Sequence, residues 1–163
     1  MTQQLFILTG ASRGMGLAMA QQLLQPGHTL ICMARNSNSQ LTAAVPAGAM
    51  LEQWTVDLSE PAPAAQQLHA WLAGQSAGRY ASATLINNAG VIPRIAPLSA
   101  CASAQDMADQ ARALRVGLEA PMLLTAAFLG ATEGWGAPPH AVARKVLNIS
   151  SGLGRRAMAS QAA

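Results

Sequence analysis

The chain has 163 residues, of which 51% are hydrophobic and 10% are charged, with a formal net charge of +3 and a pI near 9.5. This length suits one domain with a buried core. No continuous apolar run reaches the roughly 18 residues of a membrane span, and no basic segment precedes an apolar core at the N-terminus. We therefore expect no membrane partner and no signal peptide. The basic residues are scattered along the chain, which argues against a nucleic-acid partner.

The cysteines and histidines do not form a ligand set by spacing. Cys32 and Cys101 are far apart in sequence and lack metal-type spacing. His28, His69 and His140 form no ligand-spaced pair. We expect no metal site, and we expect reduced thiols in a cytoplasmic protein.

The first stretch of the chain predicts a strand, a glycine turn and a helix in succession. Leu5–Leu8 is a run of four apolar residues typical of a short buried strand. Gly10, Gly14 and Gly16 follow with the spacing G-x-x-x-G-x-G, and Leu17–Leu24 has the pattern of a helix. This order is typical of a phosphate-binding turn, because free N–H groups at a helix N-terminus favour an anion. A tight turn without a ligand is the alternative.

The next strand, expected at His28–Met33, completes a β-α-β unit. Nucleotide-binding units of this type place an acidic residue after the second strand to bind the ribose of NAD. Here Arg35 and Asn36 follow the strand, and no acidic residue precedes Glu52. Together with Arg13 in the glycine turn, this pattern favours the 2′-phosphate of NADP(H). Each arginine could instead be a solvated loop residue.

Strand and helix patterns continue to alternate along the chain, which predicts a Rossmann-type, doubly wound parallel sheet in a three-layer α/β/α arrangement. In chain order we first expect a weak helix near residues 40–45, a strand at 50–56 and a helix from N-cap Ser59 to Ala73. A turn at 74–82, which holds Tyr80, and a strand at 83–86 follow. The last expected elements are a short helix capped by Ser103 that holds Asp106 and Asp109, a long apolar helix at 111–131 bent slightly by Pro121, and a strand at 144–149 that runs into Ser150 and Ser151.

Polar and small residues follow several predicted strands. Asp57 and Leu58 end the third strand, and Asn87-Asn88-Ala89-Gly90 follows the fourth. The carboxyl ends of parallel strands meet at one edge of the sheet, where ligands bind. Asp57 and Asn87 could instead form local turn hydrogen bonds, which Asx side chains commonly make.

These segments together resemble the classical short-chain dehydrogenase/reductase family. Thr9–Gly16 is similar to the family's T-G-x-x-x-G-x-G motif, Asp57-Leu58 to its adenine-contacting acidic residue, and Asn87–Gly90 to its N-N-A-G motif. Asn148–Ser151 is similar to its N-I-S-S segment. The resemblance covers the whole chain, and the stretch 144–152 is closest to the sepiapterin reductase and benzil reductase group.

The resemblance implies one NAD(P)-binding domain over residues 1–163 that reduces a small-molecule carbonyl to an alcohol with NADPH. It also implies a homodimer or homotetramer for the full-length protein. Ser151 matches the family's catalytic serine and would hydrogen-bond the substrate carbonyl. The implied cofactor-binding residues are Gly10, Ser12, Arg13, Gly14, Met15, Gly16, Arg35, Asn36, Asp57, Leu58, Asn88, Ala89 and Gly90.

The sequence departs from the family pattern at two places. Gly117 stands where the motif V-N-x-x-x-P has an asparagine, which puts the family's proton relay in doubt. The family's Y-x-x-x-K motif is expected just beyond Ala163, and the only tyrosine and lysine, Tyr80 and Lys145, are far apart. The sequence thus predicts a chain truncated before its acid–base pair. The alternative function is a catalytically inactive NADP(H)-binding or interaction module.

Overall fold

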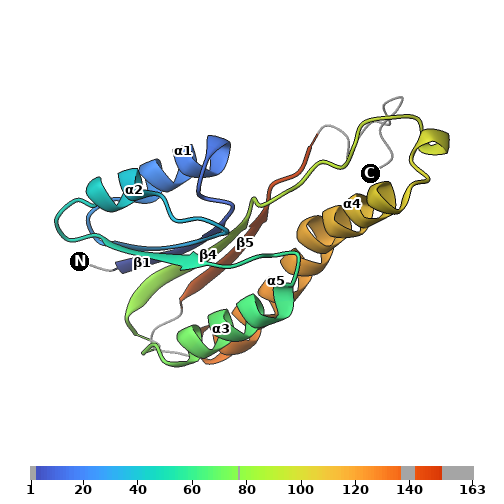
Figure 1. Ribbon diagram of the computed structural model, residues 1–163. Helices are drawn as coiled ribbons and strands as arrows, with labels where there is room; N and C mark the ends of the chain where they lie inside the picture. Colours follow the sequence, from blue (N-terminus) through green and yellow to red (C-terminus); the bar gives the residue numbers. More distant parts are fainter. Residues whose placement is uncertain (1–2, 77, 137–141, 152–163) are drawn as a thin grey trace.

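The computed structural model describes residues 3–76, 78–136 and 142–151, and their strands form one parallel sheet (Figure 1). Its order is β3-β2-β1-β4-β5, and each neighbouring pair is parallel. The chain therefore winds outward in one direction from β1 to β3 and in the other from β4 to β5, as expected for a doubly wound sheet. The strands are β1 (Gln3–Thr9), β2 (His28–Ala34), β3 (Met50–Thr55), β4 (Tyr80–Asn87) and β5 (Ala143–Asn148).

Helices cover both faces of the sheet, which confirms the predicted three-layer Rossmann-type fold (Figure 1). One face carries α1 (Gly14–Leu23) and α2 (Ser39–Ala43), and the other carries α3 (Pro61–Ala73) and α5 (Ala120–Ala131). Alternate strand residues enter two separate hydrophobic clusters, so that Ile7 packs on the α3–α5 side while Leu8 packs on the α1 side. The central strands are continuous apolar runs because both of their faces are buried.

Two predicted element boundaries are wrong. Tyr80 lies in β4 rather than in the preceding turn, because its ring is 2% exposed and stacks on Trp135 with centroids 5.8 Å apart. Ser59 does not cap α3, since Glu60 occupies the N-cap position without a side-chain capping bond. Pro61 begins that helix, where its missing N–H costs nothing.

The helices predicted around 103–109 and 111–131 are joined in one helical run. Ser103 caps α4 (Ala104–Leu114) in a capping box with Asp106, as its position predicts. A π-helical turn, Arg115–Glu119, connects α4 to α5, and in it the N–H of Ala120 donates to the carbonyl of Arg115. Pro121 has no N–H for a regular α-helical bond, and the wider turn accommodates the proline without ending the helix. Two short 3-10 turns, Leu98–Ala100 and Glu133–Gly136, complete the described elements.

The combined helix Ala104–Ala131 is long and apolar enough to cross a membrane by length and composition alone, with a mean hydropathy of 1.3 over its best window. Core helices of soluble proteins pass the same criterion. Figure 1 shows its α4 end projecting away from the sheet, while its α5 end packs beneath it. The absence of a membrane partner stays a prediction.

Both cysteines are buried thiols. Cys32 lies in β2 and Cys101 in the loop before α4. Burial raises the pKa of the Cys32 thiol to about 12, so this group is neutral at physiological pH. Within the described ranges, no group of three or more His, Cys, Asp or Glu residues is placed to hold a metal.

Replacing Gly117 with alanine should stabilise the folded protein. A Cβ at Gly117 meets nothing within 4 Å, and its φ lies outside the left-handed region. Gly117→Ala is expected to raise the free energy of unfolding by about 0.5–1 kcal/mol, or roughly 2–4 °C in Tm, because alanine loses less backbone entropy in a helix. Thermal unfolding followed by circular dichroism measures the change.

Gly14 is the matched control. A Cβ there also meets nothing within 4 Å, but φ is +56°. Gly14→Ala should therefore lower the stability by about 1 kcal/mol, because alanine is strained in this conformation. Equal shifts for the two variants would contradict the assignment of these effects to backbone conformation.

Candidate functional site

A cleft of about 280 Å³ lies at the carboxyl edge of the sheet, between the glycine turn and the ends of β2, β3 and β4. Every predicted cofactor residue lines this cleft except Asn36, which is exposed in the loop after β2. Six residues outside the predicted set also line it: Met33 and Ala34 on β2, Val56 after β3, Val91 after β4, and Arg112 and Val116 from the α4–α5 helix. The structure therefore brings the family-like segments into one place, as the parallel sheet requires.

Reciprocal hydrogen bonds between Thr9 and Asn88 join the glycine turn to the end of β4. The Thr9 hydroxyl oxygen accepts from the backbone N–H groups of Asn88 and Ala89, each at 2.9 Å. Asn88 Nδ2 donates to the carbonyl oxygen of Thr9 at 3.0 Å and lies 3.4 Å from that of Gly10. Since the chain leaves the neighbouring strands β1 and β4 in opposite directions, these bonds join the two segments at the point where they separate.

The glycines of the turn meet two different requirements. Gly10 adopts φ +73°, and a Cβ there would lie 2.9 Å from the Cα of Ala89. A Cβ at Gly16 would overlap the carbonyl oxygen of Gly10. Close backbone packing in this turn thus excludes side chains and leaves room for a ligand at the N-terminus of α1.

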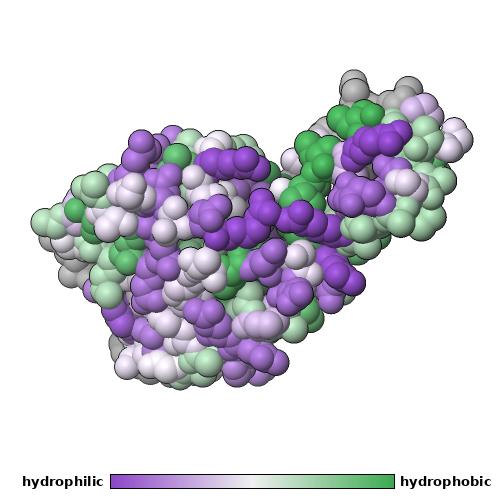
Figure 2. Space-filling view, viewed as in Figure 1, coloured by the Kyte–Doolittle hydropathy of each residue, from purple (hydrophilic) through white to green (hydrophobic). Residues whose placement is uncertain are grey.

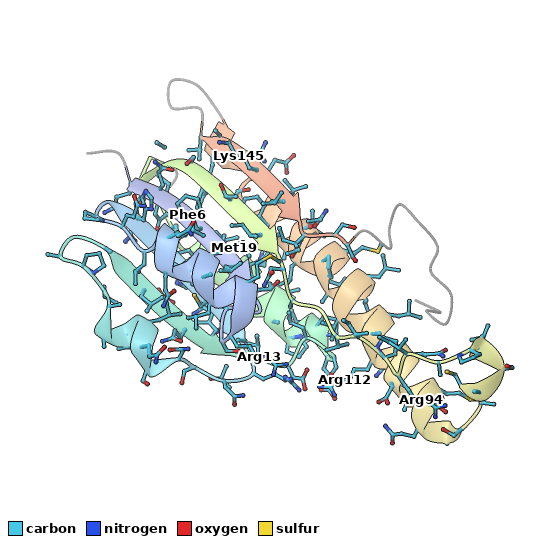
Figure 3. All side chains as sticks on the ribbon, turned by 90° about the horizontal axis from the view of Figure 1, so that it is seen from above. Phe6, Arg13, Met19, Arg94, Arg112 and Lys145 are labelled. Carbon is cyan, nitrogen blue, oxygen red and sulfur yellow. The ribbon has the colours of Figure 1, made fainter. Side chains whose placement is uncertain are left out.

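The cleft is positively charged at the β2 end. Arg13 is the N-cap residue of α1 and makes no side-chain capping bond, and the first turn of α1 holds no acidic residue. Arg13 and Arg35 are both exposed, and neither guanidinium has a hydrogen bond or ion pair within the described ranges. Figure 3 shows Arg13 and Arg112 at one end of the sheet and Lys145 near the other. Free guanidinium groups beside a helix N-terminus suit an anionic ligand.

Asp57 supplies a carboxylate in the cleft. Its Oδ1 accepts from the backbone N–H of Ser59 at 2.9 Å, so the local turn bond considered as an alternative does form. Hydrogen bonds from Ser59 lower the pKa of Asp57, and the positive charges of Arg112 and Arg35 add to this effect. The carboxylate is therefore ionised at neutral pH.

Asn87 supports the sheet instead of lining the cleft. It is 5% exposed, and its Nδ2 donates to Asn148 Oδ1 at 2.8 Å and lies 3.5 Å from Thr125 Oγ1. Its Oδ1 is buried and has no partner in the described part of the chain. These contacts join distant parts of the chain, so Asn87 has a structural role, but not through the local turn hydrogen bonds considered as its alternative.

Ser151 follows β5 on the same sheet edge and is exposed. It does not line the cleft described above, nor a neighbouring groove of about 730 Å³ lined by Gly117, Asn148 and Ser150 among others. Its catalytic role stays a prediction.

Arg112 is the main functional candidate that the sequence interpretation missed. Arg112 and Val116 both fall within the predicted helix 111–131, but only the packing of that helix against the end of the sheet shows that they line the cleft. Thr9 belongs to the T-G-x-x-x-G-x-G segment, and its position directly before the glycine turn is the sequence signal of its structural role.

Comparison with known proteins identifies the family. The family model of short chain dehydrogenase matches residues 4–163. A benzil reductase ((S)-benzoin forming) from Bacillus cereus is 31% identical over 156 residues, which cover 91% of this chain and 57% of that protein. The chain thus spans little more than half the length of this relative.

Two solved structures combine a similar fold with detectable sequence identity. A short-chain dehydrogenase/reductase from Burkholderia vietnamiensis is 34% identical, with a TM-score of 0.76 over 98% of this chain and 68% of that one. A metagenomic short-chain oxidoreductase in complex with NADP is 30% identical, with a TM-score of 0.72 over 98% of this chain and 66% of that one. The match over residues 4–163 and the shared fold place the chain in the short-chain dehydrogenase/reductase family of oxidoreductases, which use a nicotinamide cofactor.

Proposed function

We propose that the protein to which this chain belongs is an NADPH-dependent reductase of a small-molecule carbonyl compound. The observation that carries the proposal is the pair Arg13 and Arg35, which line one cleft while no carboxylate follows β2. An NAD-binding site of this type uses an acidic residue there to hold the ribose 2′-hydroxyl. Two guanidinium groups favour a 2′-phosphate instead, because each donates charge-assisted hydrogen bonds.

The remaining cleft residues suit the other parts of the cofactor. The backbone of Gly14–Gly16 and the N-terminus of α1 would hold the pyrophosphate. Asp57 and Leu58 would contact the adenine, and the small residues Ala89 and Gly90 allow a ribose or nicotinamide to pack closely. The related oxidoreductase solved with NADP supports this assignment.

Bound NADPH would supply the hydride for carbonyl reduction. The Ser151 hydroxyl would donate a hydrogen bond to the substrate carbonyl oxygen, where negative charge develops. Because the relative from Bacillus cereus is a benzil reductase, an aromatic 1,2-diketone is the first substrate to test in the whole protein.

The second candidate function, a binding module without turnover, rests on Tyr80 and Lys145. Tyr80 is buried at the start of β4, and Lys145 is exposed on β5 (Figure 3). Neither residue lines the cleft, so the two cannot form an acid–base pair there. This observation favours cofactor binding without catalysis for a polypeptide of these 163 residues.

The 163-residue chain is expected to bind NADPH more tightly than NADH. Arg13→Ala or Arg35→Ala should each weaken NADPH binding by about tenfold, since each removes a charge-assisted hydrogen bond of about 1.5 kcal/mol. NADH binding should change by less than about twofold, because NADH lacks the 2′-phosphate. Titration calorimetry measures both affinities, and Lys145→Gln is a control that removes one positive charge outside the cleft. Equal affinity of the parent chain for both cofactors would contradict NADP(H) specificity.

The same chain is expected to oxidise no NADPH in the presence of benzil. Proton delivery requires a group such as tyrosine with a neighbouring lysine that lowers its pKa, and no such pair lies in the cleft. Absorbance at the nicotinamide band follows the reaction. Turnover that depends on benzil would show that another group donates the proton.

Self-association belongs to the same proposal and is supported by an apolar stripe on the α4–α5 helix. Leu114, Leu118 and Met122 are exposed by 61%, 57% and 63%. Arg115 and Glu119 lie beside this stripe, on either side of Gly117. In an antiparallel pair centred on Gly117, Arg115 of one copy would face Glu119 of the other.

Charge reversal tests this arrangement. Arg115→Glu should shift the oligomer toward monomer, because it places two like charges against each other at each end of the pair. Adding Glu119→Arg should restore association. Light scattering after size-exclusion chromatography gives the masses, and a double variant that remains monomeric would contradict the antiparallel pairing.

A further inference from the structure

Asn38 lies between Arg35 and α2, and it bonds directly to the glycine turn. Its Nδ2 donates to the carbonyl oxygen of Ser12 at 3.1 Å, although 26 positions separate the two residues in sequence. Ser12 immediately precedes Arg13. This bond therefore joins the two segments that carry the free arginines of the cleft.

Gln53 on β3 holds the backbone of Asn38 from the other side. Its Oε1 accepts from the Asn38 N–H at 2.7 Å, and its Nε2 donates to the Asn38 carbonyl at 3.0 Å and to Thr42 Oγ1 at 2.9 Å. One side-chain amide thus satisfies both backbone groups of Asn38. The loop after β2 is fixed to the sheet as well as to the glycine turn.

The side-chain oxygen of Asn38 has a separate contact. It caps α2 by accepting from the N–H groups of Gln40 and Leu41 at 2.9 and 3.3 Å. The two ends of the amide can therefore be separated by substitution. Serine at position 38 keeps an N-cap oxygen but is too short to reach Ser12 as well.

We propose that Asn38, held by Gln53, is a positioning residue that fixes Arg13 relative to Arg35 and so sets the preference for a 2′-phosphate over a 2′-hydroxyl. The inference rests on the proposed use of NADP(H). A phosphate needs both guanidinium groups within bonding distance at once, so its binding depends on their separation. A cofactor with a 2′-hydroxyl does not bind through this pair of arginines. Its affinity should therefore not depend on the hydrogen bond between Asn38 and Ser12.

Adenosine 2′,5′-bisphosphate and 5′-AMP are suitable probes, because they differ only in the 2′-phosphate. In titration calorimetry with the 163-residue chain, Asn38→Ser should weaken binding of the bisphosphate by about fivefold to tenfold and of 5′-AMP by less than about twofold, since only the hydrogen bond between Asn38 and Ser12 is lost. Gln53→Met should act in the same direction with the α2 cap intact. Gln40→Ala, an exposed change on α2, is the matched control and should alter neither affinity.

The outcomes separate the two hypotheses. A parent chain that binds both probes equally overturns NADP(H) specificity and the role of Asn38 together. A preference for the bisphosphate that survives Asn38→Ser and Gln53→Met overturns only the role of Asn38. An equal loss for both probes shows a general structural role and also overturns it.

Discussion

The exchange of hydrogen bonds between Thr9 and Asn88 is the constraint on which the cleft depends. β1 and β4 are neighbours in the sheet, but the chain leaves them in opposite directions. The glycine turn is also bonded to the end of β2 and to Asn38, but these contacts do not reach the segment after β4. The Thr9 hydroxyl and the Asn88 amide join them across the divergence, so Gly10 sits against the backbone of Ala89. At this separation only glycine fits at position 10.

Charge in the cleft follows from the same arrangement. The carboxyl ends of parallel strands gather Arg13, Arg35 and Asp57 from separate parts of the chain, and α4 adds Arg112. These groups act together on the site, since the guanidinium charges favour the ionised form of Asp57. A cleft with several arginines, one carboxylate and a helix N-terminus is suited to a ligand with several negative charges.

Local sequence signals predicted most of the fold, and packing decided the rest. The strand, turn and helix around Gly10–Gly16 follow from nearby residues, as does the capping box of Ser103. Tyr80 was misplaced because burial against Trp135 is a contact between distant parts of the chain. The sequence predicts a cofactor role for Asn36 but none for Asn38. Asn38 differs from Asn36 because it bonds to Ser12 and Gln53, which lie far from it in sequence. No local sequence pattern predicts these contacts.

The π turn at Arg115–Glu119 also fixes how the two halves of the long helix face the protein. An α-helix rotates by about 100° per residue, so a wider turn changes the phase of everything that precedes it. α4 presents Arg112 to the cleft while α5 buries Leu124 and Phe128 beneath the sheet. Loss of one residue from this segment would rotate α4 by about 100° relative to α5 and carry Arg112 away from Asp57. The number of residues in the π turn is thus as constrained as their identities.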